Sequence, residues 1–321
     1  MHATHHRHSV ALEWLQQQAS HRFAVFSDID NTLVGTGTGF QEATNQIRSF
    51  TSDRRLPLFL ITGLSLPRVM ARIATGEIPL PEAISCGAGT EIWLRQQDGS
   101  WQKDKAYAQQ VQDSGFHVSD ITKKAEAFIR QYKENRVSFQ ASADMTPYKV
   151  SLHFFAPNKQ AAEVALHAAH VFAPFSVLYC EEINFNSSLP RGAIQKKYCL
   201  DIVPATKADA LRYMVDSFHI DGGIKAGDSG NDIAMLLQKD VLLPVLVGGH
   251  TEEVCQAICD TIAKKAAAKT LPDGRHIHIE EDGLLASKSL FQALCAWTAT
   301  VGIPVGQPLA KPKVNPQTVL Q

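Results

Sequence analysis

Short apolar runs alternate with helical patterns in two separate parts of the chain. The first part holds runs at 23–27, 58–61 and 83–86, and the second holds runs at 223–226, 241–247 and 276–279. Apolar strands that lie between helices are typical of a parallel sheet covered on both faces. The pattern therefore predicts an α/β fold with a Rossmann-like parallel core.

The sequence between these two parts has a different pattern. Ile121, Ala125, Phe128 and Tyr132 form one stripe of an amphipathic helix, and an Ala-rich helix is expected at 159–171. Strand-like runs at 137–141, 149–155, 177–185 and 198–203 surround these helices. We expect a small antiparallel α+β domain inserted into the core. The predicted division is an N-terminal segment 1–20, a discontinuous core 21–93 and 201–301, a cap 94–200 and a proline-containing tail 302–321.

Composition excludes several classes of protein. The chain has 321 residues and a formal net charge of -1, with no long basic block, which argues against nucleic-acid binding. No apolar run approaches the roughly 20 residues that cross a bilayer. The six cysteines are scattered without a CxxC pair, so we expect reduced thiols and a cytoplasmic protein. Cys255 and Cys259, one helical turn apart, are interpreted as helix packing.

The N-terminus carries His2, His5, His6 and His8 but no apolar segment or cleavage site of a secretory signal. We interpret this stretch as a terminal tail, with adventitious metal binding as the alternative.

Two acidic residues follow the first apolar run, in the sequence Asp28-Ile-Asp30-Asn-Thr32. In an open α/β sheet, ligands bind beyond the carboxyl ends of the strands, which is where these carboxylates are expected. A calcium loop is excluded, because Leu33 and Gly39 stand where such a loop has Gly and Glu. The glycines at 35–39 lack the spacing of a dinucleotide or phosphate loop and are expected to form a turn.

A second acidic group, Asp228, Asn231 and Asp232, follows the run at 223–226. Several carboxylates at one sheet edge repel one another unless a cation neutralises them. Oxygen ligands favour a hard divalent metal, and we expect Mg²⁺.

Two further elements point to the same edge of the sheet. Thr62 and Gly63 end the run at 58–61 and offer a hydroxyl and a backbone N–H. Thr206 and Asp209 predict a capping box that places Lys207 in the first turn of a helix. A cation there opposes the helix dipole, and a bound anion reverses this penalty. Phosphate binding by Lys207 is therefore favoured over a solvated surface lysine.

These motifs, in this order, resemble the haloacid dehalogenase superfamily of phosphohydrolases. The stretches 87–93, 149–153, 227–232 and 247–250 look more narrowly like the sucrose-phosphate phosphatase branch, and the likeness covers roughly residues 22–298. The resemblance implies that Asp28 is the nucleophile and that Asp30 is the general acid and base. It also implies Mg²⁺ held by Asp28, the backbone carbonyl of Asp30, Asp228 and Asp232. The phosphoryl group is expected to contact Thr62, Gly63, Lys207 and Asn231.

The cap is expected to select the leaving group. Lys149, Ser151 and His153 alternate along one strand and share a face, which either is solvated or contacts sugar hydroxyls. Glu91 and Asp201 lie at the two crossings between core and cap and are further substrate candidates. Trp93 and Trp101 either stack on a sugar ring or pack within the cap.

The chain also departs from the family pattern at two places. Leu64 stands where relatives commonly have Arg, for which Arg68 is a candidate replacement, and the stretch 204–207 is about two residues shorter.

We therefore expect a Mg²⁺-dependent phosphatase that hydrolyses a sugar phosphate, with sucrose 6-phosphate as the first named substrate. A phosphosugar mutase or phosphotransferase with the same nucleophile is the first alternative, and product analysis separates relocated from free phosphate. A non-catalytic sugar-phosphate-binding partner of a glycosyltransferase is the second alternative. It is disfavoured, because the sequence retains the acidic residues and Lys207.

Overall fold

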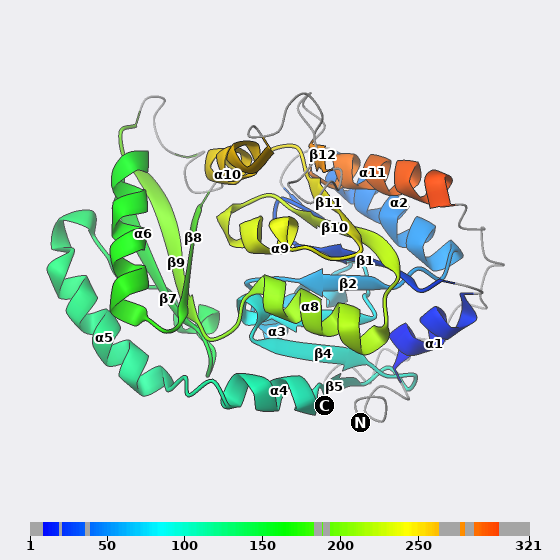
Figure 1. Ribbon diagram of the computed structural model, residues 1–321, viewed down its shortest axis with the longest axis horizontal. Coiled ribbons are helices and arrows are strands. Elements are labelled where there is room, and N and C mark those ends of the chain that lie inside the picture. The colour runs from blue at the N-terminus through cyan, green and yellow to red at the C-terminus, as the bar shows by residue number, and fades with distance from the viewer. Residues whose placement is uncertain are drawn as a thin grey trace.

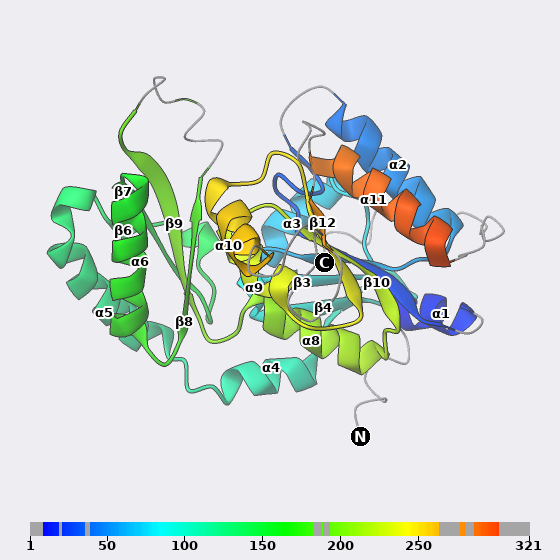
Figure 2. The same ribbon diagram turned by 45° about the horizontal axis from the view of Figure 1, so that its top comes forward.

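The computed structural model describes residues 9–18, 21–35, 39–182, 188, 193–262, 277–279 and 286–301. Two parts lie side by side, an eight-stranded sheet with helices on both faces and a four-stranded sheet with its own helices (Figures 1 and 2). We call them the core and the cap. The observed architecture is the predicted one, a Rossmann-like core with an α+β cap.

The core sheet has the order β12-β11-β10-β1-β2-β3-β4-β5. Its strands pair in parallel from β12 to β3, whereas β4 and β5 are antiparallel. Each of the six apolar runs predicted as core strands contains a strand. In the last run, position 276 lies outside the described residues. The strands are β1 Phe23–Ser27, β2 Leu58–Ile61, β3 Ala83–Cys86, β4 Glu91–Arg95, β5 Trp101–Lys103, β10 Gly222–Gly227, β11 Leu242–Leu246 and β12 His278–Ile279.

Helices cover both faces of this sheet, as Figure 2 shows for the neighbouring helices α2 and α11 on one face. Val25 of β1 packs under that face, and Phe26 packs on the opposite face with Leu211 and Met214 of α8. Adjacent residues of one strand thus fill two separate cores, which explains the continuous apolar runs. The helices are α1 Val10–Gln17, α2 Phe40–Asp53, α3 Leu66–Ala74, α4 Lys105–Gln112, α8 Lys207–Phe218, α9 Ile233–Leu237, α10 Glu252–Ile262 and α11 Ala286–Val301.

The cap sheet is antiparallel and has the order β6-β7-β9-β8. Val150, Leu152 and Phe154 alternate along β7 and are fully buried against the cap helices, as the pattern predicted. Tyr132 lies just beyond the end of α5 but still packs against this cluster. The elements are α5 Val118–Gln131, β6 Ser138–Phe139, β7 Val150–Ala156, α6 Asn158–Phe172, β8 Ser176–Glu181 and β9 Lys196–Val203.

The core sheet extends past the boundary expected after residue 93. That position falls inside β4, and β5 also belongs to the core sheet. Tyr107 and Val111 of α4 pack in the same core cluster as Ile92 and Leu94. Of these antiparallel edge strands, β4 buries alternate residues and β5 buries none, so their sequence is more polar than that of the central strands and suggested a different domain. At the second crossing, β9 runs through the expected boundary at 200 and ends at Val203.

Several predicted segments lie wholly or partly outside the described residues. These are the histidine-rich start, most of the turn at 35–39, the end of the run 177–185, the side chain of Cys259, and the tail 302–321. Cys255 packs against a small hydrophobic cluster, as expected for a helix-packing cysteine. In the described part of the chain, no helix combines the length and apolar character needed to cross a membrane.

A turn between β3 and β4 fits closely against the start of α8. This turn, the 3₁₀ helix η1 Gly87–Gly89, contains Gly89 with φ of +108°. A Cβ on Gly89 would lie 2.1 Å from the backbone oxygen of Thr206, which precedes Lys207. The position therefore requires glycine both for its backbone conformation and for the close approach of two chain segments.

We predict that Gly89→Ala destabilises the fold far more than Gly115→Ala. Gly115 also has a positive φ, of +74°, but nothing lies within 4 Å of a Cβ placed there. Gly115→Ala should cost about 1–2 kcal/mol for its backbone conformation, and Gly89→Ala about 1–3 kcal/mol more for overpacking. Urea unfolding of both variants measures the difference, and equal losses would contradict the close packing of η1 on α8.

Candidate active site

Two neighbouring parallel strands bring the two acidic motifs together. Ser27 of β1 pairs with Ala226 of β10, and the backbone N–H of Asp28 donates to the carbonyl of Ala226 at 3.0 Å. Both strands end at this level. Carboxylate oxygens of Asp28, Asp228 and Asp232 lie within 4.8 Å of one another. The parallel register thus places three carboxylates, as predicted, at one point of the sheet edge.

Lys207 lies against two of these carboxylates. Its Nζ is 2.9 Å from Asp28 Oδ1 and 2.8 Å from Asp232 Oδ1, and its side chain is only 1% exposed. The predicted capping box is present, because Asp209 Oδ2 accepts the backbone N–H of Thr206 at 2.9 Å and the Thr206 hydroxyl accepts the N–H of Asp209. The cap of α8 therefore fixes the position of the lysine.

Further hydrogen bonds orient the acidic groups. The Thr32 hydroxyl donates to Asp228 Oδ1 at 3.0 Å. Asp232 Oδ2 accepts the backbone N–H groups of Asp228 and Ser229 at 3.1 and 3.2 Å. One oxygen of Asp232 thus contacts Lys207, and the other accepts hydrogen bonds from the loop backbone.

The electrostatics of the cluster favour a bound cation. Burial raises the pKa of Asp28 to about 7, against the opposing effect of Lys207, and Asp232 raises it further. Burial, followed by the charges of Asp232 and Asp28, raises the pKa of Asp228 well above its ordinary value. Burial lowers the pKa of Lys207, but the two carboxylates outweigh it and the net shift is upward. One ammonium faces three carboxylates, and the all-oxygen donor set suits Mg²⁺.

The side chain of Asp30 lies apart from this cluster. Its Oδ1 accepts a hydrogen bond from Arg72 Nη1 at 2.6 Å, and the side chain is 48% exposed. Within the described residues, Asp30 does not join the group of carboxylates that could hold one ion. Sequence reasoning missed Arg72, whose only signal was its place on the helix that follows β2.

Thr62 and Gly63 begin the loop that follows β2, the strand next to β1. Thr62 is 1% exposed, and its hydroxyl accepts the backbone N–H of Leu64 at 3.1 Å. The carbonyl of Gly63 accepts from Lys149 Nζ of the cap at 3.0 Å. Arg68, the candidate replacement for the arginine expected at position 64, forms an ion pair with Asp144 of the cap at 2.5 Å.

Three of the predicted cap residues form one buried network. Ser151 Oγ donates to Asp201 Oδ1 at 2.5 Å, and Lys149 Nζ is 3.5 Å from Asp201 Oδ2. All three side chains are buried, so this part of the strand face is not solvated. His153 lies further along β7, with its Nε2 2.6 Å from Glu182 Oε1.

The other predicted residues lie in two different places. Asn231 is at the cap–core boundary, with its Nδ2 4.0 Å from Cys180 Sγ of β8. Glu91 instead accepts hydrogen bonds from Lys103 and Trp93 on the core sheet. Trp93 and Trp101 pack against the core hydrophobic cluster, which corrects the interpretation of these rings as cap packing.

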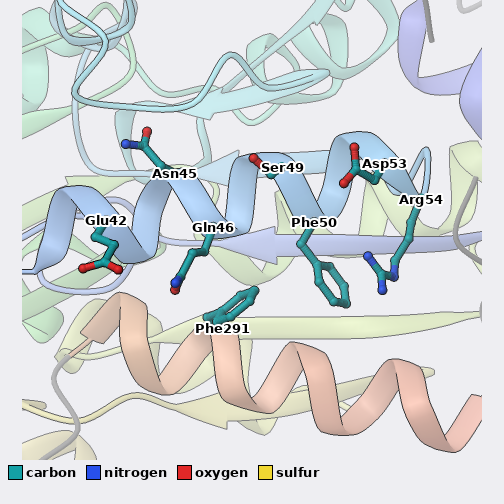
Figure 3. A pocket seen from close by; sticks show the side chains of 8 residues that line it. All are labelled: Glu42, Asn45, Gln46, Ser49, Phe50, Asp53, Arg54 and Phe291. Atoms are coloured by element: carbon teal, nitrogen blue, oxygen red, sulfur yellow. The ribbon is translucent and has the colours of Figure 1, made fainter. Parts of the chain in front are cut away.

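A groove between α2 and α11 contains none of the predicted site residues (Figure 3). The rings of Phe50 and Phe291 meet edge to face there. The guanidinium carbon of Arg54 lies 3.6 Å from the centroid of the Phe50 ring. The groove is lined by Glu42, Asn45, Gln46, Ser49, Phe50, Asp53, Arg54 and Phe291.

Solved structures share this fold. The chain is similar to the sucrose-phosphatase from Synechocystis sp. PCC6803, with 20% identity and a TM-score of 0.64 over 86% of this chain and 98% of that chain. It is also similar to the C-terminal domain of C. albicans trehalose-6-phosphate phosphatase, with 13% identity, a TM-score of 0.51 and coverage of 92% and 96%. The haloacid dehalogenase subclass IIB sugar phosphatase BT4131 has 14% identity, a TM-score of 0.51 and coverage of 88% and 99%.

These likenesses show the haloacid dehalogenase fold. Among curated proteins, no sequence matches this chain. The match to a protein family covers residues 21–271, which include every motif described above. The chain belongs to the sucrose-6F-phosphate phosphohydrolase family and is a phosphoric monoester hydrolase.

Proposed function

We propose that this protein is a Mg²⁺-dependent phosphatase that hydrolyses a sugar phosphate through an aspartyl-phosphate formed on Asp28. The observation that carries the proposal is the meeting of Asp28, Asp228 and Asp232 with Lys207 at the ends of β1 and β10. Sucrose 6-phosphate, or a related hexose or disaccharide phosphate, is the proposed substrate. The family match supports this choice, as does the related sucrose-phosphatase that was crystallised with sucrose and phosphate.

The metal would be held by Asp28, Asp228 and the backbone carbonyl of Asp30, with Asp232 supporting them. When bound, Mg²⁺ supplies positive charge that offsets the carboxylates and the phosphoryl oxygens. Thr62, Gly63, Asn231 and Lys207 are the proposed contacts of those oxygens. Lys207 provides a fixed cation whose charge burial does not remove, because two carboxylates stabilise it.

The carboxylates of Asp28 and Asp30 suit different chemical steps. An oxygen of Asp28 attacks phosphorus while the bond from phosphorus to the sugar oxygen breaks, and Asp30 gives that oxygen its proton. Asp30 then takes a proton from a water molecule, which attacks the phosphorus and releases phosphate from Asp28. Asp30 is half exposed and thus open to substrate and water, whereas Asp28 is buried.

The cap supplies the proposed contacts of the sugar. Lys149 of β7 reaches the Gly63 carbonyl, so this strand lies over the proposed phosphate loop. Asp201 accepts a hydrogen bond from Ser151 and forms an ion pair with Lys149. His153 is partly exposed and offers a polar group to a sugar hydroxyl. A site that binds a hydroxyl discriminates strongly against ligands that lack it.

We predict that Asp28→Asn reduces phosphate release by at least about 10³-fold, because an amide is a poor nucleophile. Phosphate release from a sugar phosphate measures the effect, and circular dichroism verifies folding. Asp240→Asn is the matched control, since Asp240 also pairs with a buried lysine, Lys225, at 2.8 Å. This control should lose stability and retain turnover. Equal activity of Asp28→Asn and the wild type would remove the nucleophile assignment.

We predict that Mg²⁺ stabilises the protein more at pH 8 than at pH 5.5. The pKa of Asp28 is raised to about 7, so its stabilising contribution to the metal-free fold is complete below about pH 4 and lost as the pH rises through 7. A bound cation favours the ionised carboxylates and offsets that loss over the same range.

Thermal unfolding of EDTA-treated protein, with and without Mg²⁺ at both pH values, measures this difference. We expect a shift of several degrees at pH 8 and a much smaller one at pH 5.5. Asp228→Asn should abolish the shift, and Asp240→Asn should preserve it. The same shift at both pH values would argue against a metal on these carboxylates.

We predict that His153→Ala raises KM for the preferred sugar phosphate by about tenfold, which corresponds to the loss of about one hydrogen bond. A panel of sugar phosphates identifies that substrate first. The value of kcat/KM for p-nitrophenyl phosphate should stay within about twofold of the wild type, since this substrate has no sugar hydroxyl.

His167→Ala is the matched control for this prediction. His167 bonds Tyr132 on the helical side of the cap, away from the core. An equal loss with both substrates in His153→Ala, or an equal effect of His167→Ala, would place the sugar elsewhere.

A further inference from the structure

Two cysteines lie directly opposite each other in the cap sheet. Cys180 of β8 pairs with Cys199 of β9, and Cys199 in turn pairs with His153 of β7. All three residues lie on the sheet face opposite the one that packs on the cap helices. This face is turned to the core, because Lys149 of the same face reaches the Gly63 carbonyl.

The positions of these cysteines suit a covalent bond between them. Directly opposite residues of antiparallel strands have Cα atoms about 4.5–5.5 Å apart, and disulfides span about 4.4–6.8 Å between Cα atoms. Both residues are partly exposed. Cys199 Sγ accepts a hydrogen bond from Gln140 Nε2 at 2.7 Å. The register therefore places the two residues at a Cα separation that a disulfide can span.

Two of the other described cysteines, Cys86 and Cys295, provide a contrast. Cys86 is fully buried, and burial raises the pKa of its thiol. Burial also raises the pKa of Cys295 on α11. Because the thiolate is the reactive form, both thiols are poor sites of oxidation. Among the described cysteines, Cys180 and Cys199 are the two that the strand register pairs directly.

Cys180 also lies beside the proposed active site. Its Sγ is 4.0 Å from Nδ2 of Asn231, a proposed phosphoryl contact in the same loop as Asp232. A sulfur that turns toward Cys199 leaves this position. The state of the thiol pair is thereby coupled to the loop that carries two site residues.

We propose that Cys180 and Cys199 form a reversible disulfide that lowers the activity of the enzyme. With a peroxide as the oxidant, one sulfur attacks the O–O bond of hydrogen peroxide, gives a sulfenic acid and releases one water after proton transfer. The second sulfur then displaces the hydroxyl as a second water, and the S–S bond forms. The two thiols lose two electrons and two protons, and the peroxide is reduced to two water molecules. A dithiol returns the electrons and protons and restores both thiols.

Mass spectrometry of the full-length protein tests the bond. After treatment with hydrogen peroxide and digestion without reductant, we expect a peptide that links Cys180 to Cys199 and has lost two hydrogens. The link should be absent from Cys180→Ser and Cys199→Ser, and present in the control Cys295→Ser. A sulfinic acid at either position, a link to another cysteine or a disulfide-linked dimer would overturn the proposal.

Activity tests the effect of the bond, and this part rests on the proposed function. Oxidation should lower kcat/KM by about tenfold, which corresponds to about one lost hydrogen bond at the phosphoryl group. Dithiothreitol should restore activity, and both single serine variants should resist oxidation. A fully linked protein with unchanged kcat/KM would overturn the regulatory role. If the reduced enzyme releases no phosphate from any sugar phosphate, the proposed function fails, while the mass of the linked peptide still decides the bond.

Discussion

The concentration of negative charge at the ends of β1 and β10 is the constraint on which the rest of the site depends. Asp28, Asp228 and Asp232 are buried together, and Lys207 forms ion pairs with two of them, Asp28 and Asp232. Burial makes their joint ionisation costly, as the raised pKa values of Asp28 and Asp228 indicate. The buried carboxylates therefore favour the binding of positive charge. Near neutral pH, a divalent cation neutralises them more effectively than protons do.

Much of the surrounding structure holds this charged group in place. The capping box at Thr206 begins α8 with Lys207 turned to the carboxylates, and Gly89 lets the η1 turn approach the same backbone. Thr32 fixes one oxygen of Asp228. None of these contacts acts on phosphate. They fix the positions of the carboxylates and the ammonium before a ligand binds, so that these groups need little reorganisation on binding.

The sequence predicted what local patterns encode. Apolar runs gave the strands, and because parallel strands end together, the motifs after β1, β2 and β10 had to meet at one edge. The ion pair between Arg72 and Asp30 joins residues 42 positions apart and leaves no periodic signal. The buried network of Lys149, Ser151 and Asp201 looked like a polar strand face, since alternation does not reveal what covers it. The sequence of the edge strands β4 and β5 resembled that of an inserted domain, again because a polar pattern does not reveal which elements a strand packs against.

Polar contacts join cap and core near the site. Arg68 pairs with Asp144, and Lys149 donates to the Gly63 carbonyl while it remains close to Asp201. The cation that donates to the Gly63 carbonyl therefore comes from the cap. Separation of the cap exposes charged groups that water solvates, and it therefore costs less than separation of an apolar interface. Lys149 thus ties strand β7 of the cap to the loop that follows β2.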